Sequence, residues 1–255
     1  MAIDYIKEER IALFRINRPE ARNALDMQAN REFSQAMIDF RDDPDLWVGI
    51  VTGAGDKAFC SGADFKDVPV FLKQNPEREA MPHTHWRGLE IWKPLIAAIN
   101  GMALGGGLEV ALGCDIRIAS DSAKMGFPEV KLGIIPGAGG VYRTARALSW
   151  CKAAELLFTG KIISAQEAYQ IGLINQVTPP AGLMTEARRW AQMICESAPL
   201  AVRAIKEVMF RSANATLEEG LRLEWSANRR LMGTEDSVEG HKAAAEKRKA
   251  LFGGR

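Results

Sequence analysis

The sequence predicts an α/β fold with a helical C-terminal region. Short β-branched or apolar runs alternate with segments of helical spacing, and helical signals dominate from Ser164 onward. Alternating strands and helices are typical of an α/β core, whereas the four successive helix candidates that close the chain contain few strand signals. We therefore expect a core of residues 1–198 and a helical region of residues 199–255, which meet at Ala198-Pro199.

The first predicted elements are a hairpin and a helix. Alternating runs at residues 4–7 and 11–16 flank a charged Glu-Glu-Arg sequence, a pattern typical of a hairpin. Asp26 is the expected N-cap of the helix, because its carboxylate can accept from a free N–H group of the first turn. The apolar residues of this helix keep helical spacing as far as residues 42–44, and they are Met27, Phe33, Met37 and Phe40.

Buried strands are predicted at residues 47–52, 94–99, 115–119 and 175–177. Later helices are predicted at residues 183–196, 199–210, 216–232 and 235–252. The patterns at residues 164–167 and 216–219 both fit a capping box, which starts a helix. Residues 68–85 contain three prolines and fit neither period, so we expect a long surface excursion or lid there.

Composition and charge exclude several classes of protein. The 255 residues are 47% hydrophobic and 25% charged, and 33 Lys and Arg stand against 32 Asp and Glu, a net charge of +1. These values argue against a disordered chain and against a strongly basic nucleic-acid binder. The four cysteines, Cys60, Cys114, Cys151 and Cys195, lie far apart, so we expect free thiols, a reducing compartment and a cytoplasmic location.

No targeting or membrane-spanning segment is expected. Residues 1–17 lack a continuous apolar stretch and carry acidic residues, which argues against a secretory signal and a transit peptide. Residues 94–114 are long enough to cross a bilayer, but they contain an Asn-Gly pair, a Gly-Gly-Gly run and Glu109. Because ionised glutamate is costly in hydrocarbon, we interpret this segment as a buried strand, a glycine loop and a buried helix.

Familiar site motifs are weak or missing. Residues 53–58 mimic a dinucleotide-binding fingerprint after a strand, but another glycine and no helical period follow. The sequence contains no P-loop and no GxSxG elbow. His83 and His85 could begin a zinc site, but no cysteine or third histidine stands at ligand spacing, so we interpret both as solvated loop residues.

Two glycine-rich segments follow predicted buried strands, AFCSGADFK at residues 58–66 and NGMALGGGLE at residues 100–109. Glycine lacks a Cβ atom, so backbone N–H groups can approach a ligand oxygen closely, although a tight turn explains either segment alone. Glu109 ends the second segment, and Glu129 follows in another apolar, glycine-rich setting. A pair of desolvated carboxylates can serve as general acid and general base.

Together these segments resemble the crotonase superfamily, the enoyl-CoA hydratase/isomerase family, and most of all an enoyl-CoA hydratase. The resemblance runs from NRPEARNAL at residues 17–25, through both glycine-rich segments, to GFPEVKLGIIPGAGG at residues 126–140. It continues through LFTGK at residues 157–161 and GLIN at residues 172–175 to Glu239-Gly and Glu246-Lys-Arg248, so it covers nearly the whole chain. It implies a spiral core of repeated ββα turns. It also implies a helical C-terminal part that packs against neighbouring subunits in a homotrimer or homohexamer.

The resemblance further implies a site for an acyl-CoA thioester. The backbone N–H groups of Ala63 and Gly106 would hold the thioester oxygen and stabilise an enolate-like oxyanion. Glu109 would activate and orient a water molecule, and Glu129 would donate a proton to C2. The substrate-binding loop would continue through Asp64, Phe65 and Lys66, with Lys66 near the CoA phosphates and Arg22 assisting. No cofactor, metal, nucleic acid or membrane is implied, because CoA is carried as part of the substrate.

The two glutamates favour a 2-enoyl-CoA hydratase over its relatives. A Δ3,Δ2-enoyl-CoA isomerase needs only one base, and a specialised acyl-CoA hydratase remains an alternative. Decarboxylases and thioester hydrolases of the family usually lack one of the pair, and a non-catalytic CoA-binding or RNA-binding relative has no need of either. The acyl group stays open, because the bulky side chains after residue 68 either line an acyl pocket or fill the core, namely Phe71, Leu72, Trp86 and Trp92.

Overall fold

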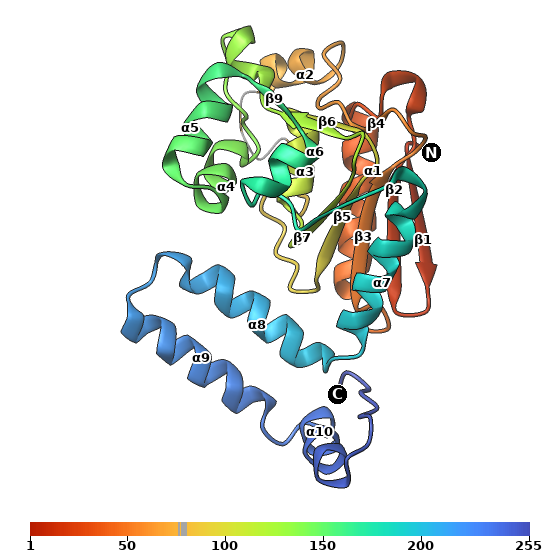
Figure 1. The fold of residues 1–255 in the computed structure, drawn as a ribbon, viewed down its shortest axis with the longest axis vertical. Coiled ribbons are helices and arrows are strands. Elements are labelled where there is room, and N and C mark those ends of the chain that lie inside the picture. The colour runs from red at the N-terminus through yellow and green to blue at the C-terminus, as the bar shows by residue number, and fades with distance from the viewer. Residues whose placement is uncertain (76, 78–80) are drawn as a thin grey trace.

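Two β-sheets lie at the centre of the computed structural model, which describes residues 1–75, 77 and 81–255 (Figure 1). Within these residues, the larger sheet has the strand order β1 (Ile3–Glu8), β2 (Ile11–Ile16), β3 (Val48–Gly53), β5 (Leu95–Ile99), β7 (Ile116–Ser120) and β10 (Gln176–Thr178). The smaller sheet has the order β4 (Ala58–Cys60), β6 (Met102–Leu104), β8 (Lys124–Gly126) and β9 (Ile162–Ser164). Neighbouring strands are parallel except for the pairs β1–β2 and β8–β9, which are antiparallel.

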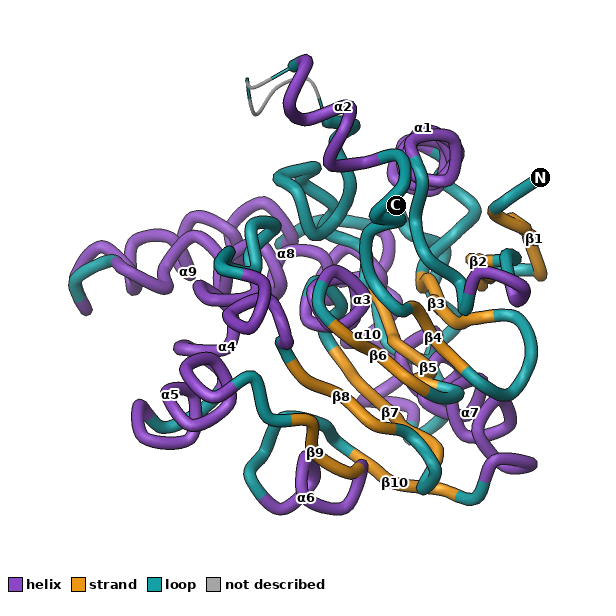
Figure 2. The backbone as a smooth tube through the Cα atoms, turned by 90° about the horizontal axis from the view of Figure 1, so that it is seen from above, coloured by secondary structure: helices purple, strands orange, loops and turns teal. Residues whose placement is uncertain are grey.

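Successive strands of the core alternate between the two sheets. β3, β5 and β7 enter the larger sheet, and β4, β6 and β8 follow them in turn into the smaller sheet. A helix comes after two of these pairs, α2 (Val68–Gln74) after β4 and α3 (Gly106–Leu112) after β6. Figure 2 shows the strands as a central block with helices around it. The chain therefore advances in ββα turns, and the predicted α/β fold is confirmed.

The larger sheet is covered on both faces, and its sequence reflects this. Every residue of β3 and β5 is buried, as expected for parallel strands between two layers of helix. α1 (Met27–Asp42) covers the face that carries Val51 and Ala97, and α7 (Leu183–Cys195) covers the face that carries Ile50 and Ala98. The α1 side includes aromatic packing, with the ring of Phe14 stacked 5.9 Å from that of Phe33.

Local signals in the first half of the chain are confirmed. The predicted hairpin is β1 and β2, and the Asp26 carboxylate accepts a hydrogen bond of 2.7 Å from the Ala29 N–H at the start of α1. The four predicted buried strands are found as β3, β5, β7 and β10. The smaller sheet was missed, because each of its strands has only three residues and is too short to display a period of two.

The remaining α-helices lie between β8 and the C-terminus, and they are α4 (Gly140–Ala147), α5 (Trp150–Thr159), α6 (Ala165–Gln170), α8 (Pro199–Arg211), α9 (Leu217–Leu231) and α10 (Glu235–Glu246). α8 and α9 run side by side and extend away from the sheets (Figure 1). The predicted capping box at Thr216 and Glu219 is complete. The one at Ser164 is half formed, because the Glu167 carboxylate bonds to Lys161 Nζ at 2.7 Å instead of the cap.

The predicted helix over residues 235–252 is wrong in its second half. α10 ends at Glu246, because Lys247 adopts the left-handed conformation with φ of +54°. The last residues fold back on the helix. The buried Asp236 carboxylate accepts from the N–H groups of Gly253 at 2.6 Å and Gly254 at 2.9 Å. These tertiary hydrogen bonds take the place of the backbone hydrogen bonds that a longer helix would form.

The segment 68–85 is only partly a surface excursion. Its first part forms α2, while Thr84 and His85 at its end are buried, and Trp86 after them is 2% exposed. Residues 76 and 78–80 of this segment lie outside the described residues. In the part of the chain that the structure describes, no helix is both long and apolar enough to cross a bilayer. α8 begins at Pro199, and the division into two parts at that point stays a prediction.

Candidate active site

Two glycine-rich loops meet at the carboxyl ends of β4 and β6. These strands are parallel neighbours, so the loops that follow them lie at the same edge of the smaller sheet. A Cβ atom placed on Gly106 would lie 3.4 Å from the Ala63 nitrogen, and one placed on Gly62 would lie 3.3 Å from the Gly106 nitrogen. Gly62 also has φ of +105°, which side chains rarely adopt. The structure therefore brings the backbone amides of Ala63 and Gly106 together.

The N–H groups of Ala63 and Gly106 are not used by the loops themselves. On either side of Ala63, Leu25 N donates to the Gly62 carbonyl at 2.8 Å and Asp64 N donates to the Leu25 carbonyl at 3.0 Å. Within the described residues, neither the Ala63 nor the Gly106 N–H donates to a protein acceptor. Two neighbouring donors without a protein acceptor can bind one oxygen atom, which is the arrangement of an oxyanion hole.

The Gly-Gly-Gly run at residues 105–107 is required by close packing on both sides. A Cβ atom on Gly107 would lie 1.9 Å from the Cys60 carbonyl oxygen of β4. A Cβ atom on Gly105 would lie 2.5 Å from Oε1 of Glu129, and Gly105 has φ of +53° and ψ of −123°. The turn between β6 and α3 therefore places the Glu129 carboxyl group directly against the residue that precedes the Gly106 donor.

We expect Gly105→Ala to displace the Glu129 carboxyl group and to lower kcat by at least about 10-fold, because proton transfer depends on position. Backbone strain should also lower the free energy of unfolding by about 1–3 kcal/mol. Gly172→Ala is the matched control, since Gly172 has φ of +80° but nothing within 4 Å of the added Cβ. Urea unfolding and kcat check both variants. Equal kcat values in the two variants would contradict the placement of Glu129.

Glu109 lies inside α3 and is 4% exposed. Its Oε1 atom accepts hydrogen bonds from Ala138 N at 2.7 Å, in the loop before α4, and from Gly140 N at 2.8 Å, the first residue of α4. Burial raises the pKa of this carboxyl group, while the two N–H donors and the guanidinium groups of Arg87 and Arg143 oppose the rise. The pKa of Glu109 therefore lies above its ordinary value, while these contacts remain available to stabilise the ionised form.

Glu129 lies in the 3-10 helix η3 (Pro128–Leu132) and is half-buried. Its Oε2 atom is buried and has no hydrogen-bond partner among the described residues. Burial raises the pKa of Glu129, and the negative charge of Glu109 raises it further. The two carboxyl groups are therefore close enough to interact, and the environment of Glu129 favours its protonated form.

The other predicted substrate-binding residues surround the first loop. Asp64 pairs with Arg18 at 3.3 Å and accepts from Lys66 N at 3.1 Å, so its carboxylate holds the loop in shape. Phe65 and Lys66 are exposed at the loop surface. Arg22 is also exposed, and its carbonyl accepts from Ser61 N at 3.1 Å. The structure thus brings the backbone of Arg22 beside Ser61, at the start of this loop.

Sequence reasoning missed several residues that shape this site. Asn23 is fully buried with φ of +57°, and its amide group donates to the carbonyl groups of Ala54 and Ala58. Arg18 joins Asp26 to Asp64, which ties the start of α1 to the substrate loop. Both residues lie in the NRPEARNAL segment at residues 17–25, and its part in the family resemblance is the signal that could have identified them.

The interpretation of both histidines as solvated is half wrong. His83 is exposed, but His85 is buried, with Nε2 3.1 Å from the Val110 carbonyl oxygen and its ring packed edge-on against Trp86. Burial lowers the pKa of His85 to about 3, so the ring is neutral. In the described part of the chain, no three His, Cys, Asp or Glu residues are grouped as metal ligands.

The bulky residues after position 68 divide between site and core. Phe71 packs with Met27, Val68 and Met81 in a small apolar cluster that includes Ala63. Trp86 instead fills the core, and Trp92 packs against Phe210 of α8, with 5.7 Å between ring centroids. Leu72 is 41% exposed. An apolar surface beside the Ala63 amide is therefore formed by α1 and α2.

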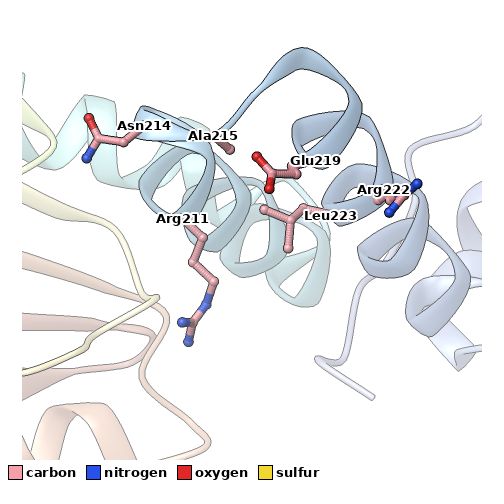
Figure 3. Close-up of a pocket in the computed structure, with 6 residues that line it drawn as sticks. All are labelled: Arg211, Asn214, Ala215, Glu219, Arg222 and Leu223. Carbon is pink, nitrogen blue, oxygen red and sulfur yellow. The ribbon is translucent and has the colours of Figure 1, made fainter.

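A separate concavity lies between α8 and α9. It encloses about 500 Å³, and the residues that line it are Arg211, Asn214, Ala215, Glu219, Arg222 and Leu223 (Figure 3). Its charged groups are already engaged. Arg211 pairs with Glu207 at 2.9 Å, and Glu219 accepts from Thr216 in the capping box. This surface has no counterpart of the paired carboxyl groups, so the glycine loops remain the candidate active site.

Comparison with known proteins agrees with the site. The family model described as "Enoyl-CoA hydratase/isomerase" matches residues 6–255. The chain belongs to the enoyl-CoA hydratase/isomerase family. The resemblance predicted from the sequence is thereby confirmed, and so, at the level of the family, is the expected enoyl-CoA hydratase class of enzyme.

Several members of the family are similar over their whole length. The "(E)-benzylidenesuccinyl-CoA hydratase" of Thauera aromatica is 41% identical over 254 residues, with 96% of both chains covered. The "Crotonyl-CoA hydratase" of Syntrophomonas wolfei is 41% identical, covering 96% of this chain and 95% of its own. The crystal structure of an enoyl-CoA hydratase from Bacillus anthracis is 36% identical, with a TM-score of 0.93 and full coverage of both chains. The crotonase fold expected for the family is therefore confirmed.

Proposed function

We propose that the protein is a 2-enoyl-CoA hydratase that adds water across the 2,3 double bond of an enoyl-CoA thioester. The observation that carries this proposal is the juxtaposition of a buried carboxyl group, Glu109, and a half-buried one, Glu129, with two neighbouring amides that lack an acceptor among the described residues. A hydratase needs a base, an acid and an oxyanion hole at one place. These residues can supply all three.

The oxyanion hole acts on the thioester carbonyl. Its oxygen accepts from the N–H groups of Ala63 and Gly106, which polarises the double bond and stabilises the negative charge that develops when oxygen adds to C3. Fixed donors of this kind are effective because they need no reorganisation during the reaction. Loss of one such donor raises the barrier by roughly 3–4 kcal/mol.

Each of the two glutamates carries out one proton transfer. Glu109 is the carboxylate, because two N–H donors and two guanidinium groups stabilise its charge. It orients one water molecule and takes its proton as the oxygen bonds to C3. Glu129 holds a proton, because it is buried beside that charge, and it donates this proton to C2. Proton exchange within the coupled pair then restores the starting state.

The rate should depend on pH through both carboxyl groups. kcat/KM falls on the acid side as Glu109 takes up a proton, and on the alkaline side as Glu129 loses one. Because both pKa values are raised, each limb lies above the ordinary glutamate value of 4.5. Initial rates across a pH series check this expectation. A profile with no alkaline limb would contradict the role of Glu129.

Hydration of crotonyl-CoA tests the proposed reaction directly. Loss of the conjugated enoyl-thioester absorbance is expected on addition of the protein, together with formation of the 3-hydroxyacyl-CoA product. A parallel assay with a 3-enoyl-CoA measures double-bond migration, the reaction of an isomerase. Migration without hydration would replace the proposal by the isomerase alternative. The printed names of the relatives differ in acyl group, so they do not fix the substrate of this chain.

The proposed reaction needs no metal or redox cofactor. The two carboxyl groups supply acid and base, and the two amides supply the electrostatic stabilisation for which a Lewis acid is otherwise used. Dialysis against EDTA should therefore leave the hydration rate unchanged, and a loss that added metal restores would contradict this. CoA enters only as part of the substrate. A cytoplasmic location stays a prediction, supported by four free cysteines.

We also propose that the active form is a homotrimer or homohexamer. The α8–α9 pair exposes several large apolar side chains, including Phe210, Leu217 and Trp225, at 62%, 80% and 64% exposure. Apolar surface of this kind is typical of a subunit interface. Light scattering should give three or six times the chain mass of 28.0 kDa. A monomer at micromolar concentration would contradict this proposal.

A further inference from the structure

Arg87 is a charged residue beside the candidate active site whose guanidinium group acts in the reaction scheme only through its charge on Glu109. It lies on a turn, where its N–H donates to the Thr84 carbonyl at 2.8 Å. Its Nη1 atom donates to Asn30 Oδ1 at 2.6 Å. Asn30 is 1% exposed on α1 and is itself fixed by a bond of 2.8 Å to the Asp26 carbonyl. The guanidinium group is therefore held at a defined position against α1.

That position borders the catalytic groups. The Trp86 carbonyl, one residue before Arg87, accepts from Arg143 at 3.1 Å, and Arg143 also donates to the Ala138 carbonyl at 3.2 Å. Ala138 in turn donates to Glu109. The charge of Arg87 acts on Glu109 of α3 and on Cys60, the last residue of β4 before the oxyanion loop. The guanidinium group thus lies against Asn30 of α1, 5.4 Å from the centroid of the Trp86 ring, and its charge reaches Glu109.

Arg87 has more donors than its partners use. A guanidinium group carries five N–H donors, and Asn30 is its one side-chain acceptor among the described residues. No described carboxylate forms a salt bridge with Arg87, although the side chain is half-buried. Glu109 is already held by two backbone N–H groups. Arg143 differs, because both of its recorded acceptors are backbone carbonyls that fix the loop before α4.

We propose that Arg87 binds a carboxylate on the acyl group of the substrate. The proposal rests on the proposed hydratase function and names its substrate class, the 2-enoyl-CoA monothioesters of dicarboxylic acids. The thioester carbonyl lies at Ala63 and Gly106, and the acyl chain extends beside the apolar cluster of α1 and α2. A carboxylate at its end meets the fork of N–H donors that Asn30 holds in place. Planar guanidinium groups suit this bidentate contact.

The experiment compares two substrates of equal chain length, glutaconyl-CoA, which ends in a carboxylate, and 2-pentenoyl-CoA, which ends in a methyl group. The wild-type protein should show a higher kcat/KM for glutaconyl-CoA. Arg87→Met should reduce the ratio of the two kcat/KM values by at least about 30-fold, because a charged group then lacks its partner. Arg87→Lys should retain part of the preference, since it keeps the charge without the planar fork.

Arg143→Met is the matched control. It also removes a positive charge that acts on Glu109, but its effect on the base is shared by both substrates, so the ratio should stay within about 3-fold of wild type. Equal losses on both substrates in Arg87→Met would overturn the proposal and leave Arg87 only as a support for Glu109. A wild-type protein that favours 2-pentenoyl-CoA would also overturn it.

Binding of saturated analogues separates this inference from the proposed function. Calorimetry should show glutaryl-CoA binding more tightly than pentanoyl-CoA to the wild-type protein, and Arg87→Met should remove the difference. If neither unsaturated substrate is hydrated but this difference is found, the hydratase proposal fails and the carboxylate site stands. If both unsaturated substrates are hydrated but the analogues bind equally to wild type, the carboxylate site is overturned and the hydratase stands.

Discussion

Glu129→Gln should lower the rate of crotonyl-CoA hydration by about 10²–10⁴-fold, the usual range for loss of a general acid. Glutamine has the size of the protonated glutamic acid that we assign to this position, and it can remain against Gly105 without a new clash. Its amide N–H groups are too weakly acidic to donate a proton to C2. KM should change little, because the thioester is held by the Ala63 and Gly106 amides. Initial rates from the decay of enoyl-thioester absorbance measure both quantities.

A surface glutamate provides the control for this substitution. Glu224 is exposed on α9, so Glu224→Gln should leave both kcat and the thermal midpoint unchanged. Glu129→Gln should match wild type in thermal midpoint within a few degrees, which separates loss of chemistry from loss of fold. Hydration by Glu129→Gln at a near-normal rate would contradict the proposed proton donor.

Glu109→Gln should lower kcat by a similar factor for a different reason. The amide oxygen can still accept from the Ala138 and Gly140 N–H groups, so the loop before α4 keeps its contacts. The side chain can no longer take a proton from water. The acid limb of the pH profile should therefore disappear, because that limb reports protonation of Glu109. A variant that loses activity but keeps the acid limb would assign the base elsewhere.

The double variant tests whether the two glutamates act on one water and one double bond. Residues that act as a unit are not additive in rate, so the loss in Glu109→Gln/Glu129→Gln should be smaller than the product of the single losses. Independent sites would give the full product. Single-turnover experiments with protein in excess make the residual reaction measurable. Contaminating wild-type enzyme can be recognised in them, because its rate depends on pH in a different way.

The location of the site could be predicted from local sequence, but its geometry could not. A buried strand, a glycine run and a helix place Glu109 near the start of α3, and each of these signals spans only a few residues. The donors that hold its carboxylate come from Ala138 and Gly140, 29 and 31 positions away. The contact between Gly105 and Glu129 is equally long-range. Such contacts depend on how the turns of the spiral stack.

The errors of the sequence-based predictions also arise from contacts between residues that are far apart in the sequence. His85 stands in a polar, proline-containing segment that has the composition of a loop, but tertiary packing buries it against Trp86 and the Val110 carbonyl. Residues 247–252 have helical composition, but Asp236 and Glu239 bind the tail and reverse it, with Leu251 N donating to Glu239 at 2.9 Å. The sequence did not identify Arg87 as a candidate site residue, because a single arginine outside any motif gives no local signal.

The turn at Gly105 lies next to all three kinds of group in the proposed chemistry. The acid lies where a Cβ atom on Gly105 would meet it, the next residue provides an oxyanion donor, and the base follows one helical turn later. Two of these groups, the Gly106 donor and Glu109, lie in the first turn of α3, so the helix itself fixes their spacing. Substitutions at Val68, Phe71 and Met81, which form the apolar cluster with Ala63, should therefore alter substrate preference without changing that spacing.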